Sequence, residues 1–248
     1  MNHKIMNKQD DIPQISLIIP SYNEEKRLQN TINEVNKYLQ DNFDLYEIIV
    51  VDDGSTDSTK NIAFEFCEKN KSIKVVSYIP NQGKGYALKQ GVLASKGHMI
   101  AFSDADLSTP IDEMNKLISE IKKGYDIVIG SRAVKNSILD EHQPLYRELG
   151  GKVLNLFIQI LAVPGIKDTQ CGFKIYTHDV AKELFEMSFI RSWAFDVEIL
   201  YLARKKGYKI SEVGVKWHHC EGSKIEPFSA GLQVLKDIIR IKLHKYSM

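Results

Sequence analysis

Residues 47–59 read EIIVVDDGSTDST, an unbroken apolar run that passes into a polar turn and then into a helical pattern. The run from Glu47 to Val51 predicts a buried strand, Asp52 to Ser55 a turn, and Ser58 to Glu68 a helix. Related strand–helix successions fill the first half of the chain. Strands that alternate with helices predict βαβ crossovers and a mostly parallel sheet, so the expected fold class is α/β.

Outward from this stretch, the hydrophobic pattern predicts the remaining elements. The expected strands cover residues 16–19, 47–51, 74–78, 98–102, 126–130, 173–176 and 210–217. The expected helices cover residues 23–39, 58–68, 85–95, 112–122, 144–161, 178–187, 196–206 and 227–245. Because no repeat or linker interrupts the pattern, we predict one domain over residues 1–248 with a C-terminal extension.

The composition is that of an ordinary globular protein, with 43% hydrophobic and 26% charged residues. The net charge of +1 gives no overall electrostatic argument for binding nucleic acid. Cys67, Cys171 and Cys220 are widely spaced, which favours reduced thiols in a cytosolic protein. No apolar signal region or stretch of the ~20 apolar residues that span a bilayer is present, so a membrane role implies lying on the surface.

Polar clusters follow three of the expected strands. They are PSYNE at residues 20–24, DDGSTD at 52–57 and SDAD at 103–106. Each alone could be a solvated turn or a helix cap. Because ligands of parallel sheets gather at the carboxyl ends of strands, all three together favour a binding site.

Asp104 and Asp106 are separated by a single residue directly after an apolar strand. In an extended segment alternate side chains point the same way, so the two carboxylates can form a hard oxygen site. Mg²⁺ or Mn²⁺ prefers such ligands, and it could neutralise a diphosphate leaving group.

Further candidates for anion binding are basic. Residues 81–85, NQGKG, join a strand to a helix and place Lys84 near a helix start, although the spacing is not that of a Walker A loop. An ordinary tight turn is the alternative there. Arg132 ends the fifth strand, and Arg147 begins an apolar helix, where the pair suits a lipid phosphate. A surface salt bridge is the alternative for each arginine.

Taken together, these segments resemble those of the family-two glycosyltransferases of the GT-A fold. Within that family, the sequence resembles the dolichyl-phosphate β-glucosyltransferases more than the dolichyl-phosphate mannose synthases. The matching segments are IIPSYNEEKRL, EIIVVDDGSTDST, NQGKGYAL, SDAD, GSRA, IKDTQCGFKIYT, RSWAFDVEILYLA and EGSKIEPFSAG. The DDGS and DAD motifs occur in many sugar transferases, whereas DTQCGFK, WAFDVE and EGSK are more specific to the lipid-phosphate branch. The resemblance implies a Rossmann-like, mostly parallel sheet flanked by helices, followed by a C-terminal amphipathic helix.

The resemblance also implies a role for individual positions. The nucleoside, expected to be uridine, would be held by residues of the first two clusters: Pro20, Tyr22, Glu24 and Asp53. Asp52 would also take part in substrate binding. Asp104 and Asp106 would hold the metal and the diphosphate sugar, with Lys84 beside the phosphates. Arg132 and Arg147 would receive the acceptor phosphate. The sugar and acceptor side would be lined by Gln170 and the segment from Trp193 to Glu198, which includes Asp196.

The same resemblance divides the chain into functional parts. Residues 14–135 would form the nucleotide-sugar half, 136–226 the acceptor half, and 227–248 the C-terminal amphipathic helix. The sequence departs from the eukaryotic enzymes in showing no N-terminal membrane helix, and it carries His218-His219-Cys220 before EGSK. One of these histidines could be a third metal ligand, or both could belong to the core or the surface.

The resulting expectation is an inverting, metal-dependent hexosyltransferase that moves glucose from UDP-glucose to dolichyl or polyprenyl phosphate. It would be a peripheral protein on the cytoplasmic face of a membrane. A phosphate monoester is already largely dianionic at neutral pH, so direct attack needs no protein base. If a base is used, Asp196 or Glu198 is the candidate. The alternatives are a transferase with a sugar hydroxyl acceptor, a catalytically silent nucleotide-sugar-binding subunit, and a nucleotidyltransferase.

Overall fold

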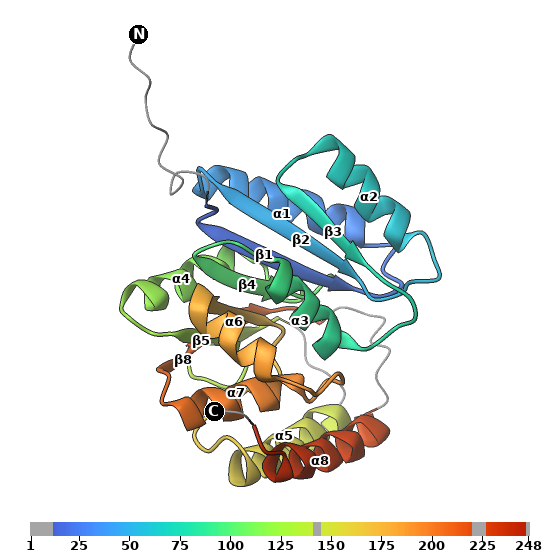
Figure 1. The fold of residues 1–248 in the computed structure, drawn as a ribbon. Helices are drawn as coiled ribbons and strands as arrows, with labels where there is room; N and C mark the ends of the chain where they lie inside the picture. The colour runs from blue at the N-terminus through green and yellow to red at the C-terminus, as the bar shows by residue number, and fades with distance from the viewer. Residues whose placement is uncertain (1–11, 141–144, 220–226, 247–248) are drawn as a thin grey trace.

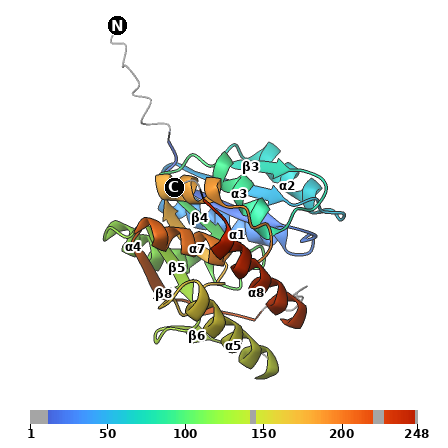
Figure 2. The same ribbon diagram turned by 60° about the horizontal axis from the view of Figure 1, so that its bottom comes forward.

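A computed structural model of the chain describes residues 12–140, 145–219 and 227–246. For residues 145–149, 152–153 and 227–230 it describes the backbone alone. Figure 1 shows a central sheet with helices on both faces, and Figure 2 shows the same arrangement from below.

The main sheet has seven strands in the order β3-β2-β1-β4-β7-β5-β8. Its strands are β1 (Ile15–Ser21), β2 (Tyr46–Asp52), β3 (Ile73–Ser77), β4 (Met99–Ser103), β5 (Ile127–Ser131), β7 (Phe173–Thr177) and β8 (Ile210–Gly214). Neighbours pair in parallel except β7, which runs antiparallel between β4 and β5. The predicted mostly parallel α/β sheet is confirmed, and the reversal at β7 is a feature that the periodicity did not indicate.

The sheet is buried on both faces because helices cover each of them. The helices are α1 (Leu28–Asn42), α2 (Thr59–Lys69), α3 (Lys84–Ala94), α4 (Met114–Lys122), α5 (Leu145–Leu161), α6 (His178–Met187), α7 (Phe195–Lys206) and α8 (Pro227–Leu243). In β1, Ile18 packs with α3, α6 and α7, whereas Leu17 and Ile19 pack with α1 and α4 on the other face. This alternation follows from the two-residue period of a strand.

Helix α1 begins at Leu28, so the predicted start at Asn23 is wrong. The chain before it is bound to the turn after β2, where the Asn23 amide donates to Ser55 Oγ at 3.0 Å and the Glu24 amide to Thr59 Oγ1 at 2.7 Å. Asn23 itself has a φ of 53°, outside the helical region. These contacts, between residues far apart in sequence, override the local helical pattern.

The strand predicted over residues 210–217 is divided in two. Strand β8 ends at Gly214, and β9 (Lys216–Trp217) pairs with β6 (Ile138–Leu139) in a separate two-stranded sheet. A side chain at Gly214 would meet the Asn136 carbonyl carbon at 2.6 Å, so the loop that follows β5 presses directly on this point. The pairing with β6 therefore redirects the strand.

Helices α5 and α8 lie side by side at the end of the molecule opposite α2, as both views show. Helix α8 turns Val234, Ile238 and Ile241 toward the core and leaves Leu232 and Ile239 exposed. Among the described residues, no helix combines the length and the apolarity needed to cross a bilayer.

Candidate functional site

The polar clusters predicted at three strand ends meet at one edge of the sheet. Strands β1, β2 and β4 are direct neighbours, and Ser21 at the end of β1 is in register with Asp52 at the end of β2. All three run parallel, so their carboxyl ends open on the same side. The topology therefore brings together segments 20–24, 52–57 and 103–106, which are far apart in the sequence.

The two acidic residues after β2 hold the surrounding loops. Asp53 is 3% exposed, and its carboxylate accepts hydrogen bonds from the amides of Gln82 at 2.8 Å and Gly83 at 2.9 Å. Asp52 accepts from the Ser55 amide at 3.0 Å and from Ser77 Oγ at 2.9 Å. Asp53, expected to hold the nucleoside, thus shapes the loop that precedes Lys84, whereas Asp52 ties the turn after β2 to the end of β3.

The segment after β1 lines the same edge. Pro20 is buried within β1, whereas the Tyr22 side chain is 38% exposed. The Glu24 carboxylate pairs with Arg27 Nε at 2.8 Å. Of the three residues, Tyr22 is the one that presents a large flat surface to solvent, as stacking on a nucleobase requires.

Lys84 meets the aspartates that follow β4. Its Nζ lies 2.5 Å from Asp104 Oδ1, with the side chains 11% and 35% exposed. Burial alone lowers the pKa of Lys84, but the carboxylates of Asp104, Asp196 and Asp106 outweigh it and hold that pKa above its ordinary value. Asp106 accepts from the Ser108 amide at 2.9 Å. The cluster therefore contains a permanent positive charge beside two carboxylates.

Asp104 and Asp106 suit a divalent cation that takes its other ligands from a diphosphate and water. Mg²⁺ is commonly bound in this way by one or two carboxylates. The Asp104 carboxylate lies against the Cα of Gly172, where a methyl group would overlap it, so the absence of a side chain there leaves room for this carboxylate. The described residues contain no group of three or more acidic, histidine or cysteine side chains placed to hold a metal.

The histidines before EGSK lie beside the second sheet. The His218 amide donates to the Ser108 carbonyl at 2.8 Å, which brings this residue to the segment after Asp106. Its ring Nδ1 lies 2.9 Å from Asp140 Oδ2, and the His219 ring lies near that of Trp217. Cys220 is outside the described residues.

A buried ion pair between β7 and α7, which the sequence pattern did not indicate, lies next to the site. Lys174, on β7, is fully buried, and its Nζ contacts Asp196 Oδ1 and donates to the Cys171 carbonyl at 2.8 Å. Burial raises the pKa of Asp196 despite Lys174 and Lys84. A lysine inside the apolar strand FKIYT was the available signal, because a buried charge requires a partner.

The loop before α7 covers Lys84. The Trp193 ring is 45% exposed, and Lys84 Nζ lies over it, 4.8 Å from the ring centroid. Glu198, expected to line the substrate, is instead fully buried and accepts from the amides of Phe189 at 3.1 Å and Ile190 at 2.9 Å. Its carboxylate therefore holds the loop between α6 and α7 through these two hydrogen bonds.

The predicted acceptor arginine is held in a bidentate pair. Arg132 Nε lies 2.7 Å and Nη2 2.8 Å from the carboxylate oxygens of Asp168, and the guanidinium lies over the Trp217 ring. Burial opposes the charge, but Asp168 raises the pKa of Arg132 above its ordinary value. Gln170, close in sequence to Asp168, is partly buried. Arg147 lies in α5, and its side chain is outside the described part of the structure.

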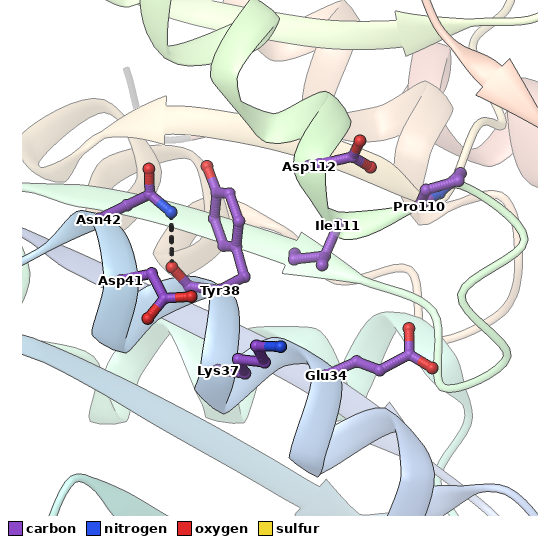
Figure 3. Close-up of a pocket in the computed structure, with 8 residues that line it drawn as sticks. All are labelled: Glu34, Lys37, Tyr38, Asp41, Asn42, Pro110, Ile111 and Asp112. Atoms are coloured by element: carbon purple, nitrogen blue, oxygen red, sulfur yellow. Dashed lines mark hydrogen bonds between the residues drawn. The ribbon is translucent and has the colours of Figure 1, made fainter.

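A separate cavity of about 300 Å³ opens between α1 and the short 3₁₀ helix Ile111–Glu113 (Figure 3). It is lined by Glu34, Lys37, Tyr38, Asp41, Asn42, Pro110, Ile111 and Asp112. None of the predicted site residues is among them. The Tyr38 hydroxyl donates to Asn115 Oδ1 at 2.9 Å, so this side chain joins α1 to α4.

Comparisons with known proteins identify the family of this chain. The model of glycosyl transferase family 2 matches residues 16–185. The chain therefore belongs to glycosyl transferase family 2. Within the family it is 41% identical over 240 residues to dolichyl-phosphate beta-glucosyltransferase of Dictyostelium discoideum, covering 92% of this chain and 73% of that one. It is 38% identical to the human protein of the same name, covering 93% and 75%. It thus groups with the dolichyl-phosphate β-glucosyltransferases.

Solved structures share the architecture. Glucosyl-3-phosphoglycerate synthase from Mycobacterium tuberculosis, solved with Mn²⁺, uridine diphosphate and glucosyl-3-phosphoglycerate, superposes with a TM-score of 0.71. The match covers 92% of this chain and 80% of the synthase at 20% identity. At that identity the likeness confirms the expected GT-A fold and carries no residue assignments.

Proposed function

We propose that this chain transfers glucose from UDP-glucose to the phosphate of a dolichyl or other polyprenyl lipid. The observation that carries the proposal is the cluster of Lys84, Asp104 and Asp106 at the carboxyl edge of the sheet, in a chain that groups with dolichyl-phosphate β-glucosyltransferases. The cluster provides a positive charge for the diphosphate of a sugar nucleotide, and carboxylate oxygens for the divalent cation that would accompany it.

On the donor side, Asp104 and Asp106 would hold Mg²⁺ or Mn²⁺, which when bound neutralises charge on the diphosphate. Lys84 is poised to support that charge: release of its ammonium from Asp104 would let it contact a phosphate oxygen. Tyr22 offers its exposed ring to the uracil. Trp193, whose ring lies against the Lys84 ammonium, would cover the donor phosphates from one side.

On the acceptor side, the attacking atom is a phosphate oxygen, already deprotonated at neutral pH because the second pKa of a phosphate monoester is about 6. The oxygen forms a bond to the anomeric carbon as the bond to the diphosphate breaks, and UDP leaves with the electron pair. One displacement inverts the centre, so an α-linked donor yields a β-linked product. Asp196 need not act as a base, in keeping with its ion pair to Lys174. Arg132, fixed by Asp168, would orient the incoming phosphate.

We further propose that the face formed by α5 and α8 rests on the cytoplasmic surface of the membrane that holds the lipid. Large apolar side chains are exposed on both helices, Ile160 by 68% and Ile239 by 59% among them. Exposed basic residues of α8 and the following segment accompany them: Lys236, Arg240, Lys242 and Lys245. An apolar face with basic residues beside it is the pattern of interfacial helices on anionic lipid.

The test of the reaction is a transfer assay with polyprenyl phosphate vesicles, Mg²⁺ or Mn²⁺, and a panel of UDP- and GDP-sugars. We expect one metal-dependent lipid-linked sugar from UDP-glucose, with Asp106→Asn lowering turnover by about 10²-fold or more because a metal ligand is lost. Donor binding without a lipid product would favour a sugar hydroxyl acceptor. No donor binding would favour a silent subunit.

The membrane face is tested by vesicle flotation of the double variant Ile160→Glu/Ile239→Glu. We expect partitioning onto anionic vesicles to fall at least tenfold, since burying one large apolar side chain contributes about 1.5–3 kcal/mol. Phe64→Glu, on α2 and also 41% exposed in its native form, is the matched control and should bind like the wild type. Equal partitioning of the double variant and the wild type would rule out this face.

A further inference from the structure

Asp237 is a buried carboxylate in a helix whose outer side is apolar and exposed. It is 1% exposed, although it lies between Lys236 and Ile238 in the middle of α8. A carboxylate removed from water must be paired or hydrogen-bonded. Arg240 Nη1 lies 2.7 Å from Oδ1, and Gln233 Nε2 donates to Oδ2 at 3.1 Å. These two partners belong to α8 itself.

The third partner of Asp237 comes from a different part of the fold. Ser192 Oγ donates to Asp237 Oδ2 at 2.7 Å, and it also accepts from the Ala194 amide at 3.2 Å. Ser192 lies in the loop of residues 188–194 that joins α6 to α7. The hydrogen bond therefore ties the C-terminal helix to this loop across 45 positions of sequence.

The residues on both sides of Ser192 contact the donor side of the site. The Arg191 carbonyl accepts from the Gly85 amide at 2.9 Å, and Arg191 Nη1 donates to Gln82 Oε1 at 2.5 Å. Trp193 lies over the Lys84 ammonium. A displacement of Ser192 would thus shift both the start of α3 and the ring above Lys84.

We infer that Asp237 is a positioning residue for the reaction proposed above: by binding Ser192, it holds Trp193 over Lys84 and links the α5–α8 face to the donor phosphates. The catalytic part of this inference rests on the proposed function. The contact between Asp237 and the loop that contains Ser192 can be measured without donor or lipid. If Asp237 served only to pair with Arg240 within α8, its replacement would leave Trp193 unaffected.

The experiment uses the full chain in a Trp217→Phe background, where Trp193 is the remaining tryptophan of the 2 in the sequence. Asp237→Ala, Ser192→Ala and the double variant are compared by acrylamide quenching of Trp193 fluorescence and by titration with UDP-glucose. We expect each single variant to raise the quenching constant about twofold and to weaken UDP-glucose binding about three- to tenfold. The double variant should bind UDP-glucose no more weakly than the single variant with the lower affinity, since the two residues share one contact.

Two variants keep the result interpretable. Asp237→Asn retains an oxygen that can accept the Ser192 hydrogen, so it should restore the quenching constant toward the wild-type value. Asp41→Asn, an exposed carboxylate on α1, should match the wild type in both measurements. If Asp237→Ala fails to fold, Ser192→Ala and Asp237→Asn carry the test.

The outcomes separate the two proposals. Wild-type quenching and wild-type UDP-glucose affinity in folded Asp237→Ala and Ser192→Ala would overturn the inference, as would fully multiplicative losses in the double variant. If the parent protein binds no UDP-glucose, the proposed function fails, and the quenching data alone decide whether Asp237 holds the loop.

Discussion

Replacing Lys84 by methionine is expected to lower the rate of glucosyl transfer by about 10²- to 10³-fold, the range seen when one preorganised group is removed from a developing charge. Methionine keeps an unbranched side chain of similar length but removes the ammonium that lies 2.5 Å from Asp104. Without that positive charge, the leaving diphosphate loses a charged partner whose own side chain is only 11% exposed. The loss should appear in kcat as well as kcat/KM, because the charge grows as the bond breaks.

The matched control is Lys60→Met on α2, where the native side chain is exposed. Its transfer rate and thermal midpoint should equal those of the wild type. A Lys84→Met protein with a normal thermal midpoint and a rate within about threefold of the wild type would contradict the role of Lys84 at the transition state. A rise in KM alone would reduce that role to ground-state binding of the donor.

Replacing Lys174 by methionine is expected to destabilise the protein by about 3–5 kcal/mol, because it leaves the buried Asp196 carboxylate without the ammonium that contacts it. The ammonium is fully buried, and its carboxylate partner Asp196 is 3% exposed. Urea denaturation at pH 7 measures the loss. The double variant Lys174→Met/Asp196→Leu should recover most of it, since apolar residues of similar volume commonly replace a buried ion pair without net cost.

The pH dependence of the Lys174→Met variant provides an independent check. Burial already raises the pKa of Asp196 in the native protein, and loss of Lys174 removes a charge that lowers it. A carboxyl with a raised folded-state pKa stabilises the fold below its unfolded pKa of about 3.9 and loses that contribution as the pH rises through the folded value. The deficit of the variant should therefore shrink between pH 7 and about pH 4. A deficit below about 1 kcal/mol at pH 7 would show that Asp196 is satisfied without Lys174.

Most of the helices and strands could be predicted from local hydrophobic patterns. Apolar runs such as residues 47–51 predict strands, and periodic segments such as 178–187 predict helices, because each depends on residues close together in the chain. The sequence also predicted that the clusters at 20–24, 52–57 and 103–106 would lie together. Strands that alternate with helices pair in parallel, so their carboxyl ends open on one edge. The departures occur at residues 23–27 and 214–217, where distant segments hold the backbone.

By itself, then, the sequence determined the α/β class, the strand-end location of the polar clusters, and the closeness of Asp104 and Asp106 within one segment, because periodicity and spacing are local properties. Only the tertiary structure decided which charges compensate one another. The contacts of Lys174 with Asp196, Arg132 with Asp168, and Asp237 with Ser192 join residues 22, 36 and 45 positions apart. Their energies depend on burial and on distances of a few ångströms, which arise only when β7, the loops and α8 pack together.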